Sequence, residues 1–341
     1  MAFGWGIVGT GAIARQFAAD LTHAPGAHIA AVHSRSPEKA EAFRAAFKAG
    51  RAYGDLDALL ADGAVDAVYI ATPNAAHAEQ ALLAIAAGKP VLVEKPLALA
   101  GADAGRIEAA ALAKGTFAME AMWTRFLPAV RRARAKVALG EIGPIRAIRA
   151  NLSYVHDETP GSRFYEPQGG GALYDLGVYP ISLALHFLGH PESVSGRWFA
   201  AQSGVDKSAE VELHYDRAVA RLSCGFDRTG ENSLLVEGTT GTLRLRAPFL
   251  KAQRLTHYSR ADSEIPLLEE RGLSKILSGW LVPGRKVEQL RFPGGGLQFE
   301  AIAVMDAVRQ GKTQSDLMPL DESRAALAII EQVLSQPPSA A

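Results

Sequence analysis

Three side chains in this sequence have the chemistry to handle a proton on a reacting oxygen: Lys95, Asp175 and Tyr179. Asp175 and Tyr179 are four residues apart, so on a helix they share one face. A phenol can pass a proton to or from a substrate oxygen, and a nearby ammonium favours the phenolate and lowers the pKa of the tyrosine. The alternative is structural: Tyr179 only packs, Asp175 caps its helix, and Lys95 is an ordinary loop lysine.

A glycine-rich run near the start of the chain has the spacing of a nucleotide-binding turn. An apolar segment, residues 3–8, leads into Gly9-x-Gly11-x-x-Ala14, and an amphipathic helical pattern follows. Gly9 allows a tight turn, Gly11 lets the backbone approach a pyrophosphate, and Ala14 lets the helix pack on the strand. The free N–H groups of the helix start would face the phosphates. The cofactor-binding residues predicted here are Gly9, Thr10, Gly11, Ala12 and Ile13; the alternative is a simple tight turn.

The end of the next predicted strand indicates which nicotinamide cofactor is preferred. An acidic residue at this place binds the ribose hydroxyls of NAD, but residues 33–36 read His-Ser-Arg-Ser, with no carboxylate before Glu38. A hydroxyl and a guanidinium suit a 2′-phosphate. We therefore predict NADP, with NAD less favoured, and contacts from Ser34 and Arg35. Ser36 can cap the following helix at the same time.

Two further segments follow predicted strands, where open α/β sheets place their ligands. One runs from Thr72 to His77, and there Asn74 is expected to cap the helix that carries the histidine. The other contains Glu94 and Lys95. The cofactor-binding residues predicted in the two segments are Thr72, Pro73, Asn74, His77, Glu94 and Lys95.

A third group of residues is predicted to line the substrate site. Trp123, Arg125 and Phe126 follow the last strand of the first half, and they fit either a substrate site or the core between domains. Tyr154 and His156 are added from the first strand of the second half. If Tyr179 does not carry the proton, His156 or Asp175 is the next candidate.

These residues need a scaffold, and the first 121 residues supply alternating strands and helices, which predict a parallel sheet. Strands are expected at 3–8, 28–33, 67–71, 90–94 and 116–119, and helices at 12–21, 37–47, 77–87 and 103–113.

The second half has mostly strand patterns with few helices. Strands are expected at 145–155, 193–199, 210–215, 219–226, 233–237 and 242–246, with hairpin turns at 216–217 and 241, and helices at 128–139, 172–188, 299–309 and 320–334. The predicted fold class is α/β: an N-terminal Rossmann domain (residues 1–121) and an α+β domain with a large, mostly antiparallel open sheet (residues 122–336), followed by a frayed tail (337–341). We expect the open sheet to leave an apolar face that joins copies into a homodimer or higher oligomer.

Composition excludes several other classes of protein. The chain has 341 residues, and its 36 basic and 36 acidic side chains balance, so no nucleic-acid surface is indicated. Its apolar runs are all shorter than the roughly 20 residues of a membrane span, and its start lacks a signal-peptide pattern. One cysteine fits a reducing compartment, so we expect a cytoplasmic location. Nine scattered histidines show no ligand spacing, and we expect no metal.

Taken in order, several motifs resemble the glucose–fructose oxidoreductase/inositol dehydrogenase (Gfo/Idh/MocA) family. They are Gly9-x-Gly11-x-x-Ala14, Ala71-Thr72-Pro73-Asn74-x-x-His77, Glu94-Lys95-Pro96-Leu97 and Gly169–Gly171 followed by Asp175-Leu176-Gly177-Val178-Tyr179. Met119–Phe126 looks more like the dimeric dihydrodiol dehydrogenases, a branch that includes NADP-dependent D-xylose dehydrogenases. The resemblance implies catalytic roles for Lys95, Asp175 and Tyr179, and a Lys95–Pro96 peptide that is often cis. Tyr179 stands where many members have histidine, which makes inositol dehydrogenase activity less expected.

We therefore expect an NADP(H)-dependent oxidoreductase that transfers hydride to or from a secondary alcohol or hemiacetal carbon of a sugar or cyclic diol. Two alternatives remain open: an NAD-dependent glycoside hydrolase that oxidises its sugar transiently, and a non-catalytic sensor of cofactor or sugar. Release of NADPH separates the first two, and any turnover removes the third.

Overall fold

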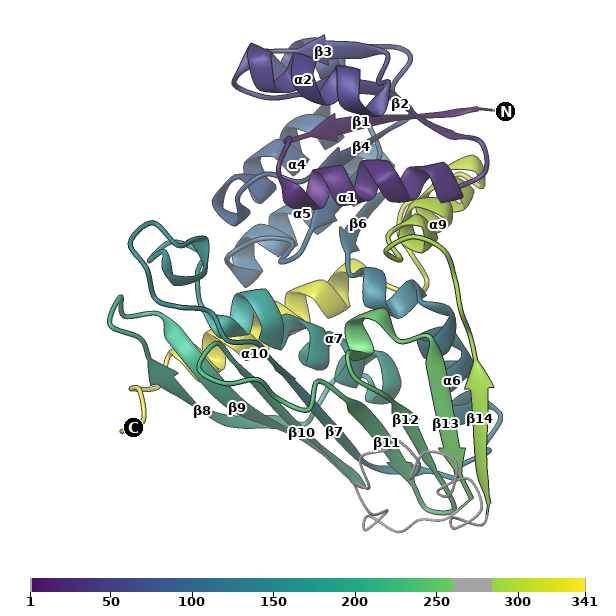
Figure 1. Cartoon of the computed structure of the whole chain (residues 1–341), viewed down its shortest axis with the longest axis vertical. Coiled ribbons are helices and arrows are strands. Elements are labelled where there is room, and N and C mark those ends of the chain that lie inside the picture. Colours follow the sequence, from purple (N-terminus) through teal and green to yellow (C-terminus); the bar gives the residue numbers. More distant parts are fainter. Residues whose placement is uncertain (1, 260–283, 341) are drawn as a thin grey trace.

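The computed structural model describes residues 2–259 and 284–340, and these form two sheets in two layers of the molecule (Figure 1). The first sheet has six strands in the order β3-β2-β1-β4-β5-β6, and the second has eight in the order β14-β13-β12-β11-β7-β10-β9-β8. The predicted fold class is confirmed: a Rossmann sheet comes first, and a larger, mostly antiparallel sheet follows.

All strand pairs of the first sheet are parallel. Its strands are β1 (Phe3–Val8), β2 (Ala27–His33), β3 (Arg51–Tyr53), β4 (Ala67–Ile70), β5 (Val91–Glu94) and β6 (Ala118–Ala121), and its helices are α1 (Ala12–Asp20), α2 (Pro37–Phe47), α3 (Leu56–Leu60), α4 (His77–Ala86) and α5 (Gly101–Lys114). Strands β1, β4, β5 and β6 are buried along their whole length, as in sheets covered on both faces. The strand order reverses between β1 and β4, and a ligand crevice is expected at their carboxyl ends.

The second sheet is antiparallel except where β7 pairs with β10. Its strands are β7 (Ile145–Ser153), β8 (Ser193–Ala200), β9 (Asp206–Tyr215), β10 (Ala218–Gly225), β11 (Leu234–Gly238), β12 (Thr242–Leu245), β13 (Arg254–Tyr258) and β14 (Arg285–Gln289), and the helices of this half are α6 (Pro128–Ala138), α7 (Val178–Leu188), α9 (Gln298–Arg309) and α10 (Leu320–Leu334). The two predicted hairpins join β9 to β10 and β11 to β12. The sequence analysis missed β3, α3, β13 and β14, which are all five residues or shorter.

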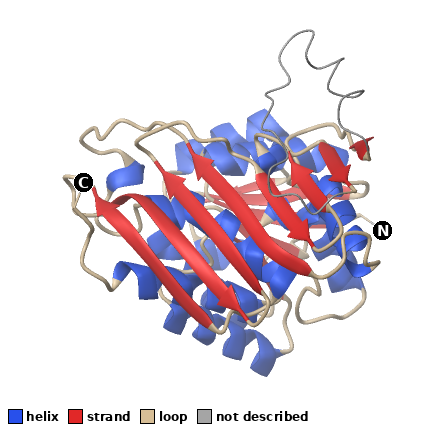
Figure 2. Ribbon diagram, turned by 90° about the horizontal axis from the view of Figure 1, so that it is seen from below, coloured by secondary structure: helices blue, strands red, loops and turns tan. Residues whose placement is uncertain are grey.

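No helix within residues 2–259 and 284–340 covers one face of the second sheet, as expected, but that face is charged and not apolar. Residues that alternate along its strands form cross-strand ion pairs such as Arg221 with Glu212 (2.9 Å) and Arg197 with Glu210 (2.8 Å). The apolar alternate positions point the other way, toward α6, α7 and α10, and the helices lie behind the sheet in Figure 2. The expectation of an apolar open face is therefore wrong, because alternation gives the solvent side to arginine and glutamate.

The C-terminal part of the chain ties the two domains together. Helix α10 contacts α5 of the first domain and α7 and β8 of the second. The backbone N–H groups of Gly295 and Leu297 donate to the carboxylate of Asp20 on α1 (2.7 and 3.0 Å). Within the segment expected to be frayed, the N–H of Ser339 donates to the carbonyl of Trp198 (2.8 Å), so this part runs along β8. The domain boundaries remain a prediction.

Candidate active site

Lys95, Asp175 and Tyr179 lie together, although 80 residues of sequence separate the lysine from the aspartate. Lys95 follows β5, and its ammonium donates to the backbone carbonyl of Asp175 (2.6 Å) and to the Asp175 carboxylate (3.2 Å). The same nitrogen lies 4.9 Å from the centre of the Tyr179 ring. The Tyr179 hydroxyl accepts a hydrogen bond from the indole N–H of Trp123 (3.2 Å). Side chains from three separate segments therefore meet at one place.

Burial decides the charge state of the tyrosine. The pKa of Tyr179 is raised to about 12, because burial of the phenol outweighs the opposing effect of the Lys95 ammonium. The expectation that Lys95 brings the pKa of the tyrosine below its ordinary value is therefore wrong. Burial also disfavours charge on Lys95 and Asp175, but their contact prevails, raising the pKa of the lysine and lowering that of the aspartate. The arrangement is an ion pair beside a neutral phenol.

The helix that carries Asp175 and Tyr179 does not start as a regular α-helix. Residues Leu173–Gly177 form a π-helical turn, and α7 continues from Val178. Gly177 packs closely on β10: a Cβ there would lie 3.0 Å from the sulfur of Cys224 and 2.9 Å from the Leu173 side chain. The sequence predicted one continuous helix. Single-turn π-helices of this kind are frequent at functional sites.

The first glycine turn fits a nucleotide diphosphate. Gly9 has a φ of +108°, and a Cβ there would come within 2.4 Å of the Ala71 carbonyl, so only glycine is accommodated. Gly11, by contrast, faces open space, and it begins α1 without a side-chain cap. The first N–H groups of α1, around Ala12 and Ile13, therefore remain available to phosphate oxygens.

In the segment after β2, Ser36 and Arg35 have different surroundings. Ser36 caps α2, with its hydroxyl accepting from the N–H of Lys39 (3.3 Å), as predicted. The hydroxyl of Ser34 accepts from the N–H of Ser36 (3.3 Å). Arg35 is exposed, and within residues 2–259 and 284–340 no carboxylate pairs with it. A cation thus stands unneutralised at the carboxyl end of β2.

Two of the other predicted cofactor residues, His77 and Asn74, make hydrogen bonds that hold loops of the protein together. The His77 ring is buried, with its nitrogens 2.8 Å from the carbonyl oxygen of Pro96 and 2.9 Å from that of Thr72, so it ties together the loops after β4 and β5. The Lys95–Pro96 peptide is cis. Asn74 does not cap α4, contrary to expectation: its amide donates to the carbonyl of Gly169 (2.9 Å) and joins the two domains.

Glu94 points into the protein interior and not toward the crevice. Its carboxylate accepts hydrogen bonds from the Tyr69 hydroxyl and from the N–H of Lys95. Burial raises the pKa of Glu94 to about 7, although Tyr69 and Lys95 oppose the shift. Glu94 therefore holds the backbone of Lys95 in place. Its buried position does not favour the predicted contact of its carboxylate with a cofactor.

The residues around Trp123 were predicted to line either a substrate site or the core between domains, and they do not all have the same role. Trp123 reaches Tyr179, as described above. Arg125 is fully buried, where it donates to Ser182 of α7 (2.8 Å) and to Glu322 of α10 (2.6 Å). Phe126 is buried as well. The positions of Arg125 and Phe126 favour a role in the core of the second domain over one in lining substrate.

A small aromatic cluster lies on the segment after β7. His156 stacks on Phe164 with ring centres 3.8 Å apart, while Tyr154 is half-buried just before it. Arg163 was not predicted: its guanidinium lies 3.6 Å from the Asp175 carboxylate and 4.3 Å from the centre of the Phe164 ring. Residues 157–168 have no periodicity that could have indicated this contact.

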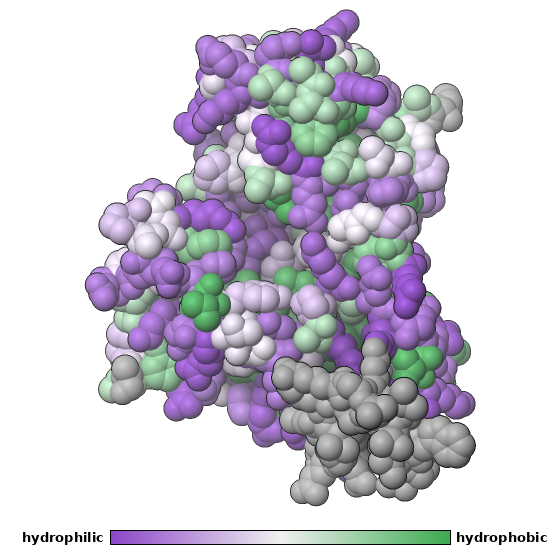
Figure 3. All heavy atoms as spheres, viewed as in Figure 1, coloured by the Kyte–Doolittle hydropathy of each residue, from purple (hydrophilic) through white to green (hydrophobic). Residues whose placement is uncertain are grey.

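The face seen in Figure 3 is hollowed where the two domains meet.

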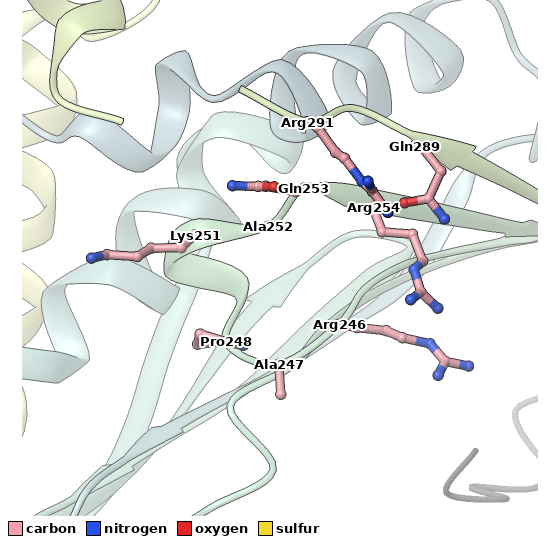
Figure 4. A pocket seen from close by; sticks show the side chains of 9 residues that line it. All are labelled: Arg246, Ala247, Pro248, Lys251, Ala252, Gln253, Arg254, Gln289 and Arg291. Atoms are coloured by element: carbon pink, nitrogen blue, oxygen red, sulfur yellow. The ribbon is translucent and has the colours of Figure 1, made fainter. Parts of the chain in front are cut away.

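A pocket of about 380 Å³ lies elsewhere, between the segment that follows β12 and the neighbouring ends of β13 and β14 (Figure 4). Four of its nine lining residues are cationic, and none belongs to the predicted site; the lining consists of Arg246, Ala247, Pro248, Lys251, Ala252, Gln253, Arg254, Gln289 and Arg291. Arg246 and Arg254 extend to one side of this region and Lys251 to the other. Pocket size therefore does not locate the lysine–tyrosine site.

The described parts of the chain lack the features of a membrane-spanning helix and of a metal site. Among residues 2–259 and 284–340, no helix is long and apolar enough to cross a membrane. Nor does this described part hold a group of three or more His, Cys, Asp or Glu side chains placed to bind a metal ion.

Two family models match successive parts of the chain. Residues 3–121 match the model of the oxidoreductase family with an NAD-binding Rossmann fold (GFO_IDH_MocA), and residues 130–244 match the GFO/IDH/MocA C-terminal domain. The chain belongs to the Gfo/Idh/MocA family. Trans-1,2-dihydrobenzene-1,2-diol dehydrogenase of Mus musculus is 31% identical over 337 residues, covering 97% of this chain and 96% of that protein; its Homo sapiens counterpart is 32% identical over 341 residues, covering 98% and 96%.

Two solved structures share the architecture over nearly the whole chain. KijD10, a 3-ketoreductase from Actinomadura kijaniata in complex with NADP and TDP-benzene, has 27% identity and a TM-score of 0.78, with 97% of each chain covered. Levoglucosan dehydrogenase, in complex with NADH and levoglucosan, shows the same fold at 21% identity and a TM-score of 0.82, covering 98% of this chain and 97% of that one. The protein is thus an NAD(P)-dependent oxidoreductase of the dihydrodiol dehydrogenase branch.

Proposed function

We propose that this protein is an NADP(H)-dependent oxidoreductase that acts on a secondary alcohol, hemiacetal or carbonyl carbon of a sugar or cyclic diol. The observation that carries the proposal is the contact of Lys95 with both Asp175 and Tyr179 at the end of β5. The relatives named as dihydrodiol dehydrogenases support a diol substrate, and KijD10 supports a reductase of related chemistry. Because these relatives are named as dehydrogenases and reductases, neither the glycosidase nor the sensor alternative is favoured.

The chain's own residues handle the proton and the developing charge. A bound nicotinamide supplies or accepts the hydride. Tyr179, a neutral phenol at pH 7, donates its proton to the substrate oxygen as a carbonyl is reduced, and the Lys95 ammonium stabilises negative charge on that oxygen. Trp123 fixes the direction of the tyrosine hydroxyl. The high pKa of Tyr179 favours reduction near neutral pH, and oxidation is expected to accelerate as the pH rises.

The preference for NADP is proposed from Arg35. Its exposed guanidinium follows β2, in the place where an acidic residue would select NAD, and Ser34 lies beside it. A guanidinium there offers charge-assisted hydrogen bonds to a 2′-phosphate.

A substrate screen tests the proposed activity directly. Aldoses, anhydrosugars, inositols and dihydrodiols are each incubated with NADP⁺ at pH 7 and pH 9, and NADPH is read by its absorbance; the matching ketones are assayed with NADPH. We expect turnover with at least one sugar or diol and a lower KM for NADP⁺ than for NAD⁺. Aglycone release from a glycoside without net NADPH formation would instead establish the glycosidase reading.

We also propose a homodimer or higher oligomer joined through the open face of the eight-stranded sheet. That face is covered by no helix in the described parts of the chain, and it carries exposed arginines and glutamates in alternating rows, including Arg149, Glu210 and Arg221. Sedimentation at micromolar concentration is expected to give a dimer or larger species, and Arg221→Glu to weaken it. A monomer at that concentration contradicts the proposal.

A further inference from the structure

A buried carboxylate that the reaction does not use lies against the start of the helix that carries Asp175 and Tyr179, which we call the catalytic helix. Asp206 is the first residue of β9 and is 2% exposed. Its carboxylate accepts a hydrogen bond from the N–H of Leu173, at 2.7 Å. Burial raises the pKa of Asp206 to about 7, and the groups that oppose this shift are backbone N–H donors, with no basic side chain among them. The carboxylate therefore acts on the backbone at the beginning of this helix.

The fit between Asp206 and the glycine triplet is close. Gly171 has a φ of +105°, and a Cβ at this residue would lie 2.1 Å from a carboxylate oxygen of Asp206. The carbonyl of Gly171 accepts from the N–H of Asp175 (3.1 Å). One short path of contacts thus runs from the Asp206 carboxylate through the helix start to the residue that holds Lys95.

A helix start leaves backbone N–H groups without partners, and an aspartate that accepts from them stabilises the first turn and interacts well with the helix dipole. Here the capping aspartate comes from a strand 33 residues away from Leu173 and not from the residue before the helix. Asp206 caps the π-helical turn. In that turn the backbone carbonyl of Asp175 accepts a hydrogen bond from the Lys95 ammonium. The position of that carbonyl depends on how the turn begins.

We propose that Asp206 is a positioning residue for the Lys95–Tyr179 pair: its carboxylate fixes the first turn of the catalytic helix and so keeps Asp175 against Lys95. The inference rests on the proposed function, since it presupposes that Lys95 and Tyr179 handle the proton. Asp206 itself has no contact with the Lys95 ammonium or the Tyr179 ring. Its loss is expected to lower kcat more than it changes cofactor affinity, because the nucleotide turn belongs to the other domain.

The chain offers a matched control in Asp20. This aspartate is also buried, and it too accepts hydrogen bonds from backbone N–H groups, in this case those of Gly295 and Leu297, where a second glycine triplet leads into α9. The contact chemistry is the same, but α9 carries none of the three predicted catalytic residues. Asp20→Asn therefore measures what the loss of such a contact does to stability alone.

The test compares Asp206→Asn, Asp206→Ala and Asp20→Asn in the full-length protein, using the best substrate from the screen. A misplacement of about 1 Å can lower a rate about 10²-fold. We expect Asp206→Ala to lower kcat by about that factor and Asp206→Asn, which keeps one acceptor oxygen, by about tenfold. The dissociation constant of NADPH, followed by its fluorescence, should stay within about twofold in both. Asp20→Asn should lower the melting temperature but keep kcat.

The outcomes separate this inference from the proposed function. If both Asp206 variants keep kcat within twofold while Tyr179→Phe is inactive, the positioning role is wrong and the proposed function stands. If Asp20→Asn loses as much kcat as Asp206→Asn, the effect is one of general stability and the inference is again overturned. If Tyr179→Phe is fully active, the proposed function itself fails. Should Asp206→Ala not fold, the Asp206→Asn comparison with Asp20→Asn decides alone.

Discussion

The two ends of the proposed cofactor crevice are built in opposite ways. At one end, Tyr179 is buried, the Lys95 side chain is only 13% exposed, and each already holds hydrogen-bond partners within the protein. At the other end, Arg35 is exposed on the loop after β2, and the described parts of the chain place no carboxylate against it. One region has its charges satisfied internally, and the other presents a charge to solvent.

The difference follows from what each end has to do. A proton donor must be held in place before the substrate arrives, and burial with fixed partners achieves that at the cost of a shifted pKa. A cation that selects a phosphate gains most if its partner is the ligand, so it must stay hydrated and unpaired beforehand. The catalytic end should therefore respond to mutation in rate and in pH dependence, and the selecting end in cofactor affinity alone.

The largest expected effect is at Tyr179. Tyr179→Phe removes the hydroxyl and keeps the ring, so turnover should fall about 10²–10⁴-fold, the usual contribution of general acid–base catalysis, while NADPH binding and melting temperature hold. Steady-state kinetics on the best substrate measures this. Tyr215→Phe is the control, since it deletes a hydroxyl that donates to the Gly189 carbonyl away from the site. If Tyr179→Phe keeps more than half the activity, the tyrosine only packs.

A second comparison tests whether Lys95 and Tyr179 act on the same step of the reaction. Lys95→Met should lose about as much rate as Tyr179→Phe, and the double variant should be little worse than either, because residues that act on one step are not additive. The measurement is kcat for the four proteins at one pH. Losses that multiply in the double variant would mean that lysine and tyrosine work independently.

At the exposed end, Arg35→Ala should weaken NADP binding at least tenfold and leave NAD nearly unchanged. The loss of a charge-assisted contact to phosphate costs about 1.5–3 kcal/mol. Fluorescence titration with NADPH and NADH gives both constants. Arg44→Ala is the matched control, because this arginine on α2 is already paired with Glu41 (2.6 Å). Equal losses for the two cofactors would remove the 2′-phosphate assignment.

The smallest expected effect concerns stability at the buried end. The pKa of Glu94 is about 7 in the folded protein and near 4.5 when unfolded, so its contribution to stability is present below pH 4.5 and is lost as the pH rises through 7. Glu94→Gln cannot ionise, so its melting temperature relative to the parent protein should rise between pH 5 and pH 8. For Arg35→Ala the same difference should stay flat. Parallel curves for Glu94→Gln would contradict this account.

Much of the fold could be predicted from short-range patterns. Helices α2 and α10 begin and end where the sequence indicated, because Ser36 caps the first and Pro319 precedes the second. The elements missed, such as β3 and β14, are short and form by pairing with strands that are distant in sequence or stand at a sheet edge. A few residues carry too little periodic signal to indicate a strand.

The candidate site was predicted less completely. The sequence indicated Lys95, Asp175 and Tyr179, and the structure brings them together, but Asp206 and Arg163 had no local signal because their partners lie in other segments. The sequence also placed Arg125 equally well at a substrate site or in a core, since the residue type alone does not determine burial.

By itself, the amino-acid sequence determined the glycine turn at Gly9, the order of strands and helices, and the absence of an acidic residue where Arg35 stands, because each depends on neighbours within a few positions. The tertiary structure decided the charge state of Tyr179 and the place of Lys95 against Asp175. Both depend on burial and on contacts between segments up to about 80 residues apart, and these exist only once the two domains have packed.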